Sequence, residues 1–145
     1  MVLVLLGTQN NSFHRLLEEI QRNIENGNIK DSVIVQEGYT KFSSKDMTIY
    51  NQIPMEEMKK LINKADLIIT HGGVGSIITS IEQGKKVIAV PRLKEYNEHV
   101  NNHQLDIVKS FDEMGYIIGV TDVSQLGDAL KRIEQLEQEN AGLRE

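Results

Sequence analysis

Residues 67–80, LIITHGGVGSIITS, decide the fold of this chain, because an apolar run passes into a glycine-rich turn and then into a helical pattern. Residues 67–70 predict a buried strand, and Gly72, Gly73 and Gly75 let the backbone approach a ligand without Cβ clashes. The helix that follows points unpaired N–H groups and its positive dipole end at the turn, and Ser76 adds a hydroxyl. The stretch therefore predicts a phosphate site where strand becomes helix.

The spacing of these glycines matches neither of the two common nucleotide motifs. It is not G-x-G-x-x-G, and no Lys-Ser or Lys-Thr pair follows the glycines as it does in a P-loop. The turn by itself therefore indicates a phosphate group without indicating a dinucleotide or an ATPase.

On both sides of this stretch, short apolar runs alternate with longer segments of helical period, which is typical of a parallel sheet covered by helices on both faces. The predicted strands are residues 2–6, 32–36, 47–50, 67–70, 86–90 and 116–120. Predicted helices run from Ser12 as N-cap to Gly27, from Pro54 with Met55, Met58, Leu61 and Ile62 inward, over 75–83, over 98–111, and from Ser124 onward. We expect a Rossmann-like α/β fold.

Length and charge set the broad class. The 145 residues fit one domain spanning 1–145, with an exposed tail expected over 137–145. A net charge of −5 and the absence of a long Lys/Arg stripe argue against a nucleic-acid or anionic-membrane binder. With no cysteine there is no disulfide framework, and the apolar opening stops at Gly7, too short to cross a bilayer.

Polar residues follow four of the predicted strands, at the edge where parallel sheets bind ligands. They lie in residues 7–9, 51–54, 71–76 and 92–104. Thr8 and Gln9 fit a ligand contact and fit equally well a turn and a cap. Lys41, Lys45, Arg92 and Lys94 suggest a mildly basic rim, although loop lysines are usually just solvated.

The histidines raise the question of a metal. His71 follows a strand and fits a ligand contact, or else a hydrogen-bonded histidine at a strand end. His99 and His103 lie four apart on a predicted helix, a zinc-binding spacing, but no third ligand is near in sequence. Because no Asp-x-Asp pair follows a strand either, we expect no catalytic metal and no cofactor.

Two strings carry a family resemblance, ADLIITHGGVGS over residues 65–76 and NNHQL over residues 101–105. With them, nearly the whole chain resembles the donor-binding half of GT-B glycosyltransferases, specifically the glycosyltransferase family 28 C-terminal domain. It looks closest to small catalytic subunits of two-part transferases, of the bacterial exopolysaccharide type or the eukaryotic type that transfers GlcNAc to a dolichol-linked sugar.

The resemblance implies a UDP-sugar site. His71 and the turn amides would face the diphosphate, the Ser76 hydroxyl would meet a phosphate oxygen, and Gly7 and Thr8 would lie near the phosphates. The backbone around Ile53 would pair with the uracil edge.

Three further positions follow from the same resemblance. Gln104 stands where relatives contact the donor sugar's hydroxyls, and His103 stands where many carry an acid. Thr79 departs from the family pattern, since relatives often have a ribose-binding Glu there. Recognition of the ribose is therefore weaker or comes from another part of the chain.

A GT-B enzyme has a second domain that binds the acceptor and supplies the base, and this chain has no room for one. The resemblance implies inverting transfer from a UDP-sugar to a lipid-linked acceptor, with a membrane-associated partner subunit and a cytoplasmic location at the inner membrane face. Expected docking surfaces are residues 92–104 and the helix from Ser124, whose stripe is Leu126, Leu130, Ile133, Leu136 and Leu143. For Leu126 and Leu130, packing in the core is the better interpretation.

Two alternatives stay open. The chain fits a non-catalytic UDP-binding subunit that enhances a partner transferase, an interpretation that Thr79 favours. It also fits a sugar-nucleotide epimerase, although those enzymes need both halves in one chain.

Overall fold

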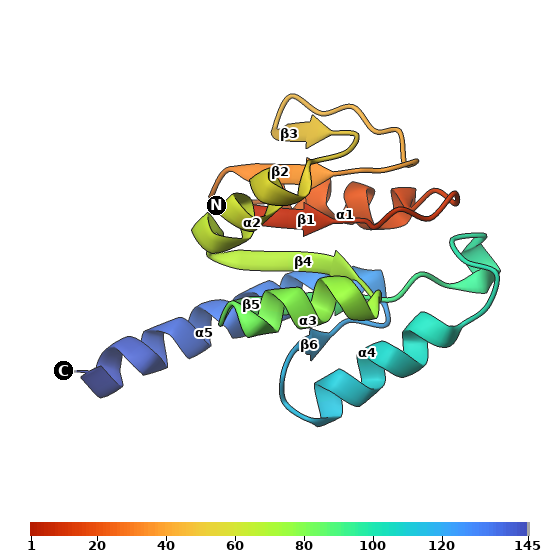
Figure 1. The fold of residues 1–145 in the computed structure, drawn as a ribbon. Helices are drawn as coiled ribbons and strands as arrows, with labels where there is room; N and C mark the ends of the chain where they lie inside the picture. The colour runs from red at the N-terminus through yellow and green to blue at the C-terminus, as the bar shows by residue number, and fades with distance from the viewer. Residues whose placement is uncertain (145) are drawn as a thin grey trace.

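The chain folds as one parallel sheet with helices on both faces (Figure 1). The computed structural model describes the backbone of residues 1–144 and the side chains of residues 1–137. Six strands lie in the order β3-β2-β1-β4-β5-β6, and every neighbouring pair is parallel. They are β1 (Val2–Leu5), β2 (Val33–Gln36), β3 (Met47–Tyr50), β4 (Leu67–His71), β5 (Lys86–Val90) and β6 (Ile118–Gly119). This is the strand order of the Rossmann fold, which confirms the predicted class.

The helices form two layers. They are α1 (His14–Glu25), α2 (Met55–Lys64), α3 (Val74–Glu82), α4 (His103–Glu113) and α5 (Leu126–Arg144), with 3-10 turns η1 (Lys94–Tyr96) and η2 (Val123–Gln125). Helices α1 and α5 supply the core residues of one face, and α2, α3 and α4 those of the other. Figure 1 shows the two layers on opposite sides of the sheet.

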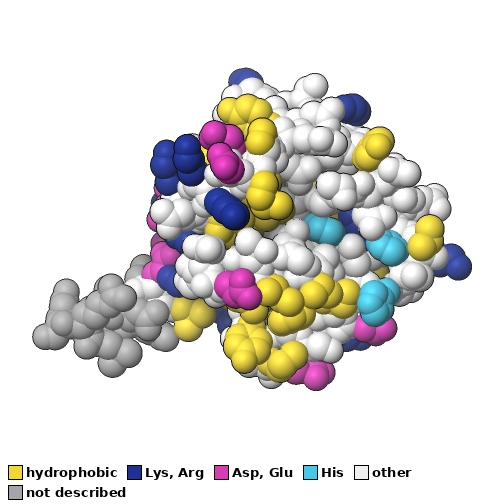
Figure 2. All heavy atoms as spheres, viewed as in Figure 1, with side chains coloured by type: hydrophobic (Ala, Val, Ile, Leu, Met, Phe, Trp, Pro, Cys, Tyr) yellow, Lys and Arg dark blue, Asp and Glu magenta, His cyan; other side chains and the backbone are white. Residues whose placement is uncertain are grey.

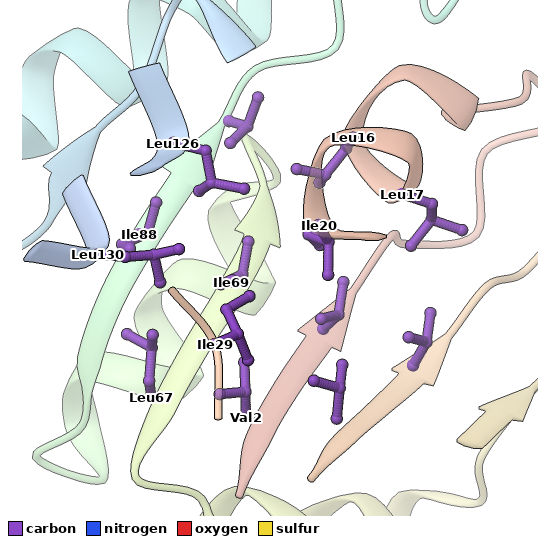
Figure 3. Close-up of a cluster of buried hydrophobic side chains, with 14 of the residues drawn as sticks. Val2, Leu16, Leu17, Ile20, Ile29, Leu67, Ile69, Ile88, Leu126 and Leu130 are labelled. Atoms are coloured by element: carbon purple, nitrogen blue, oxygen red, sulfur yellow. The ribbon is translucent and has the colours of Figure 1, made fainter. Parts of the chain in front are cut away.

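The core explains why the strands read as unbroken apolar runs. In β1, Val2 and Val4 pack into the cluster with α1 and α5, whereas Leu3 and Leu5 pack into the cluster on the other face. Successive side chains of a strand point to opposite faces, so a strand covered on both sides is apolar throughout. Figure 3 shows the first cluster, where Leu16 and Ile20 of α1 meet the strands beside Leu126.

All six predicted strands are present, but several local predictions near helix starts are wrong. Ser12 does not cap α1, which begins at His14 after Phe13, and the Phe13 N–H donates instead to the Thr40 hydroxyl at 2.8 Å. Met55 does not point inward, because at the first position of α2 its side chain is 69% exposed. The strand predicted over 116–120 is confined to Ile118–Gly119.

The helix predicted from residue 98 begins five residues later, at His103. Asn97 adopts a left-handed conformation with φ of 58°, which ends η1 and turns the chain. Glu98 is then buried, with its carboxylate bound to Arg15. The Asn101 side chain accepts a hydrogen bond from the His103 N–H at 2.9 Å, and α4 starts there.

Helix α5 contributes to the core along part of its predicted stripe. Leu126, Leu130 and Ile133 are buried, as expected for core packing, and Leu136 is partly exposed. The predicted docking residue Leu143 and most of the predicted tail have side chains outside the described residues. Within the described part of the chain, no helix combines the length and apolar character that a membrane span requires.

Candidate functional site: the turn after β4

The site predicted around residues 71–76 lies between β1 and β4, where the strand order of the sheet reverses. Strands β1 and β4 are neighbours at the centre of the sheet, but α1 leaves β1 over one face and α3 leaves β4 over the other. The connections after the two strands therefore diverge and open a crevice at the carboxyl ends, the usual ligand position in this architecture. Figure 2 shows histidine side chains gathered toward the side of the molecule at which the strands of Figure 1 point.

Helix α3 presents unpaired backbone donors to this crevice. Its N-cap is Gly73, which makes no side-chain cap, and the first intrahelical bond runs from the Ile77 N–H to the Gly73 carbonyl at 3.1 Å. The amides of Val74, Gly75 and Ser76 precede that bond and have no acceptor within the helix. Because a Cβ built on Gly75 would meet no atom within 4 Å, the space beside the turn is open to a ligand.

His71 ends β4 and fits tightly between two glycines. A Cβ on Gly7 would come within 2.5 Å of the imidazole Nε2, and a Cβ on Gly73 within 2.4 Å of its Cε1. Gly7 also has φ of +77°, a conformation that favours glycine. The two glycines therefore make room for the histidine ring, which joins the loop after β1 to the start of α3.

The ring is neutral at physiological pH. Burial and, secondarily, the positive charge of Arg92 lower the pKa of His71 from 6.5 to about 4. Both effects disfavour the imidazolium. A neutral histidine in this crevice can still donate one hydrogen bond to an anion.

Gln104 links His71 to its surroundings from the first turn of α4. Its Oε1 accepts hydrogen bonds from the Gly72 and Arg92 backbone N–H groups, each at 3.0 Å, and its Nε2 lies 3.1 Å from His71 Nδ1. Gln104 is only 5% exposed, so little of its amide is left for the sugar contact predicted from the family resemblance. That contact stays a prediction.

Arg92 does not belong to an exposed basic rim, because its side chain is 1% exposed and is among the largest that are fully buried. Its guanidinium donates to the backbone carbonyls of Leu6, Asn11 and Glu98, and its centre lies 5.0 Å from the centre of the Phe13 ring. Burial lowers its pKa to about 10, which leaves it charged. Arg92 therefore ties the loop after β1 to the segment after β5.

A second arginine completes this cluster. Arg15 of α1 donates two hydrogen bonds to the Glu98 carboxylate, at 2.9 and 3.0 Å, and Glu98 also accepts the Leu93 N–H. Arg92 donates to the backbone carbonyl of the same Glu98, while Arg15 pairs with its carboxylate. The two arginines therefore both fix Glu98, one at its carbonyl and the other at its side chain. Sequence reasoning missed Arg15 and gave Arg92 only as part of an exposed rim, because Arg15 pairs with Glu98, and Arg92 with Leu6 and Asn11, from far away along the chain.

The other predicted site residues lie around this centre. Ser76 is half-buried in the first turn of α3, Thr79 is exposed one turn further on, and Thr8 is exposed after β1. Ile53 lies in the connection from β3 to α2, and His103 is exposed at the start of α4. With strands spaced about 4.8 Å apart, the ends of β3 and β4 are roughly 14 Å apart, so a ligand touching Ile53 and His71 must lie along the strand ends.

The structure does not support the zinc interpretation of His99 and His103. His103 opens α4 and His99 lies in the preceding turn, so the two do not share a helix face. Among the residues with described side chains, no three His, Asp or Glu groups are close enough to hold a metal ion.

Several proteins named UDP-N-acetylglucosamine transferase subunit ALG13 are similar to this chain. The human protein is 35% identical over 55% of this chain and 7% of its own length, and the Candida glabrata protein is 27% identical over 73% and 51%. The Debaryomyces hansenii protein is 27% identical over 81% and 55%. The chain thus spans about half or less of these relatives.

Solved structures show the same fold at low identity. The glycosyltransferase CalG4 of calicheamicin matches 91% of this chain and 33% of its own, with a TM-score of 0.66 and 14% identity. The kitacinnamycin enzyme matches 90% and 34%, with a TM-score of 0.65 and 16% identity. The model of the glycosyltransferase family 28 C-terminal domain matches residues 1–143. Together with the ALG13 relatives, this match shows that the chain belongs to the glycosyltransferase family 28 C-terminal domain family.

Proposed function

We propose that this chain is the donor-binding, catalytic subunit of a two-part inverting glycosyltransferase that takes its sugar from a UDP-sugar. The observation that carries the proposal is the position of His71, held between Gly7 and Gly73 beside the unpaired amides that open α3. That arrangement offers several hydrogen-bond donors to one anion, and the family membership makes a nucleotide diphosphate the anion to expect.

In the proposed reaction the bond between the sugar and the diphosphate breaks as an acceptor hydroxyl attacks the opposite side of the anomeric carbon. Negative charge then grows on the leaving diphosphate, where the α3 amides, the His71 N–H and the Ser76 hydroxyl can meet it. A partner protein supplies the base that removes the acceptor proton. The proposal includes a lipid-linked acceptor of polysaccharide biosynthesis and action at the cytoplasmic membrane face through that partner.

The relatives support the donor and the two-part organisation. Their name describes a subunit of a UDP-N-acetylglucosamine transferase, which makes UDP-N-acetylglucosamine the first donor to test. Val74 and Ile78 on α3 and Val100 in residues 92–104 are exposed apolar side chains, and they offer a surface for a partner.

We expect the purified chain to bind UDP without any divalent metal, because backbone amides and side-chain N–H and O–H donors hold the diphosphate. Calorimetry with UDP, UDP-N-acetylglucosamine, ADP and GDP, each with and without a chelator, measures this. Binding of the uridine nucleotides alone, unchanged by the chelator, is the expected result. Affinity that disappears with the chelator and returns with Mg²⁺ or Mn²⁺ would refute the metal-free site.

Ser76→Ala should weaken UDP binding by about 10- to 150-fold, which corresponds to the roughly 1.5–3 kcal/mol of a hydrogen bond to a charged group. The same calorimetry measures the loss. Ser110→Ala, on the exposed side of α4, removes a hydroxyl outside the crevice and should bind UDP like the parent. Equal affinities for all three proteins would place the phosphate away from α3.

One observation favours a second function, that of a non-catalytic UDP-binding subunit that enhances a partner transferase. Thr79, exposed on α3, offers a hydroxyl where relatives often hold the ribose with a carboxylate, and weaker nucleotide binding suits an enhancer better than a catalyst. Reconstitution with the partner separates the two functions, because an enhancer supports transfer even when His71→Ala has abolished UDP binding to this chain.

A further inference from the structure

The orientation of the Gln104 amide is settled by its neighbours. Its Oε1 faces the N–H groups of Gly72 and Arg92, and backbone N–H groups only donate hydrogen bonds. An amide turned the other way would bring its NH₂ against two donors. The oxygen therefore points to the backbone, and the NH₂ group points to His71.

That orientation determines where the proton of His71 lies. Gln104 Nε2 lies 3.1 Å from His71 Nδ1 and can only donate, so Nδ1 must be the nitrogen with the free lone pair. A neutral imidazole carries its single proton on the other nitrogen. His71 is thus the Nε2–H form, a donor at Nε2 and an acceptor at Nδ1.

The protonated nitrogen is the one that reaches the crevice. Cβ atoms on Gly7 and Gly73 would lie 2.5 and 2.7 Å from Nε2, which places it between the loop after β1 and the start of α3. Nε2 has no hydrogen-bond partner among the described residues, and it is not among their buried unpaired atoms, which belong to Thr70 and Arg92. Its N–H is therefore available to a ligand.

We infer that Gln104 is a positioning residue that holds His71 as the neutral Nε2–H tautomer, so that the histidine donates a hydrogen bond to the donor diphosphate without carrying a charge. The inference rests on the proposed function for the identity of the ligand, but the tautomer itself does not. It gives Gln104 a role through His71 in place of a contact with the sugar.

The charges around the ring suit a neutral donor. The charged and titratable groups that face His71 are Arg92, in the segment after β5, and His99, in the turn before α4. Each disfavours a second proton on the ring, as does burial, and the pKa of about 4 lies below the physiological range. Since the diphosphate of a UDP-sugar has no proton to lose between about pH 5 and pH 8, affinity for it should stay constant over that range.

Gln104→Glu tests the inference with almost no change in shape. One carboxylate oxygen keeps the two backbone hydrogen bonds, while the other presents an acceptor to Nδ1 and draws a proton there. His71 then binds the diphosphate only as an imidazolium, because its neutral form carries the proton on Nδ1 and turns a bare Nε2 to the ligand. Affinity for the UDP-sugar should therefore fall about tenfold for each pH unit above the raised pKa of His71.

Two measurements decide the outcome. Nitrogen NMR of the imidazole in the ligand-free chain should show Nδ1 unprotonated and Nε2 protonated in the parent, and Nδ1 protonated in Gln104→Glu. Calorimetry with UDP-N-acetylglucosamine from about pH 5 to pH 8 should be flat for the parent and steep for the variant. Gln83→Glu, an equal charge change at the exposed far end of α3, should match the parent in both.

A parent spectrum with a protonated Nδ1, or a Gln104→Glu variant with the parent's spectrum and pH profile, would overturn the inference. If no UDP-sugar binds the parent at all, the proposed function fails, while the spectrum of the free chain still decides the tautomer. If Gln104→Glu does not fold, the parent spectrum and the flat parent profile decide it.

Discussion

Gly73→Ala should weaken UDP-sugar binding by about 10- to 150-fold, because it displaces the His71 ring and removes a hydrogen bond to a charged group worth roughly 1.5–3 kcal/mol. The backbone of Gly73 has φ of −77° and ψ of 128°, which alanine adopts without strain. The cost therefore comes from the new methyl group, which would lie 2.4 Å from His71 Cε1. Buried and bonded to Gln104, the ring cannot move aside without losing its place beside α3.

A double-mutant cycle isolates that cause. In a His71→Ala background the ring is gone, so adding Gly73→Ala should cost little more, and the two changes should be strongly non-additive. Circular dichroism and thermal unfolding of each variant test whether the fold is kept. Additive losses in calorimetry would show that the methyl group acts directly on the ligand or on the helix.

Gly75→Ala offers a matched comparison, because its methyl group would enter open space. Any loss of affinity there cannot come from a clash within the protein. It would mark the volume that the bound phosphate occupies, whereas unchanged affinity would place the phosphate nearer His71.

The isolated chain should transfer no sugar at a detectable rate, and transfer should appear when the partner subunit is added. The donor site proposed here lies at the carboxyl edge of one sheet, and its outer side faces solvent, which neither positions an acceptor nor supplies a base. An assay with UDP-N-acetylglucosamine and a lipid-linked acceptor, with and without candidate partners, measures this. Sustained turnover by the chain alone would refute the two-part organisation.

The surface that receives the partner can be tested in the same assay. Val100 is 74% exposed in residues 92–104, and we expect Val100→Glu to abolish transfer by the mixture while UDP still binds. Met114→Glu is the matched control, since Met114 is 59% exposed at the far end of α4. Equal activity of both variants would move the docking surface to α5, where Leu136 is the exposed candidate.

The strands, their parallel pairing and the turn after β4 could be predicted because they depend on local patterns. Apolar runs mark strands that are buried on both faces, and glycines mark a close approach of the backbone. The start of α4 could not be predicted in this way. It is set by the left-handed Asn97 and by the bond from Glu98 to Arg15, 83 residues away in sequence.

The same limit applies to the site. His71, the glycines and Gln104 stand out in the sequence, but their mutual contacts join the loop after β1, the end of β4 and the first turn of α4, which are far apart in sequence. From the sequence, Arg92 is interpreted as a solvent-exposed basic residue, because arginine is seldom buried without partners. Its partners are backbone carbonyls of Leu6 and Asn11, which no pattern of side chains reveals. The Ser12 cap failed for a related reason, since α1 begins after Phe13, whose N–H is held by the Thr40 hydroxyl, 27 residues away in sequence.

The burial of Arg92 has a consequence for how the crevice opens. Its guanidinium joins carbonyls on both sides of the crevice, from Leu6 and Asn11 after β1 to Glu98 after β5. Moving either segment away alone would leave the buried Arg92 guanidinium without some of its hydrogen-bond partners, at a cost of several kcal/mol. The loop after β1 and the segment after β5 must therefore loosen together, as one cooperative unit. A ligand that orders the loop at Gly7 thereby also orders residues 93–98, next to the surface that we assign to the partner.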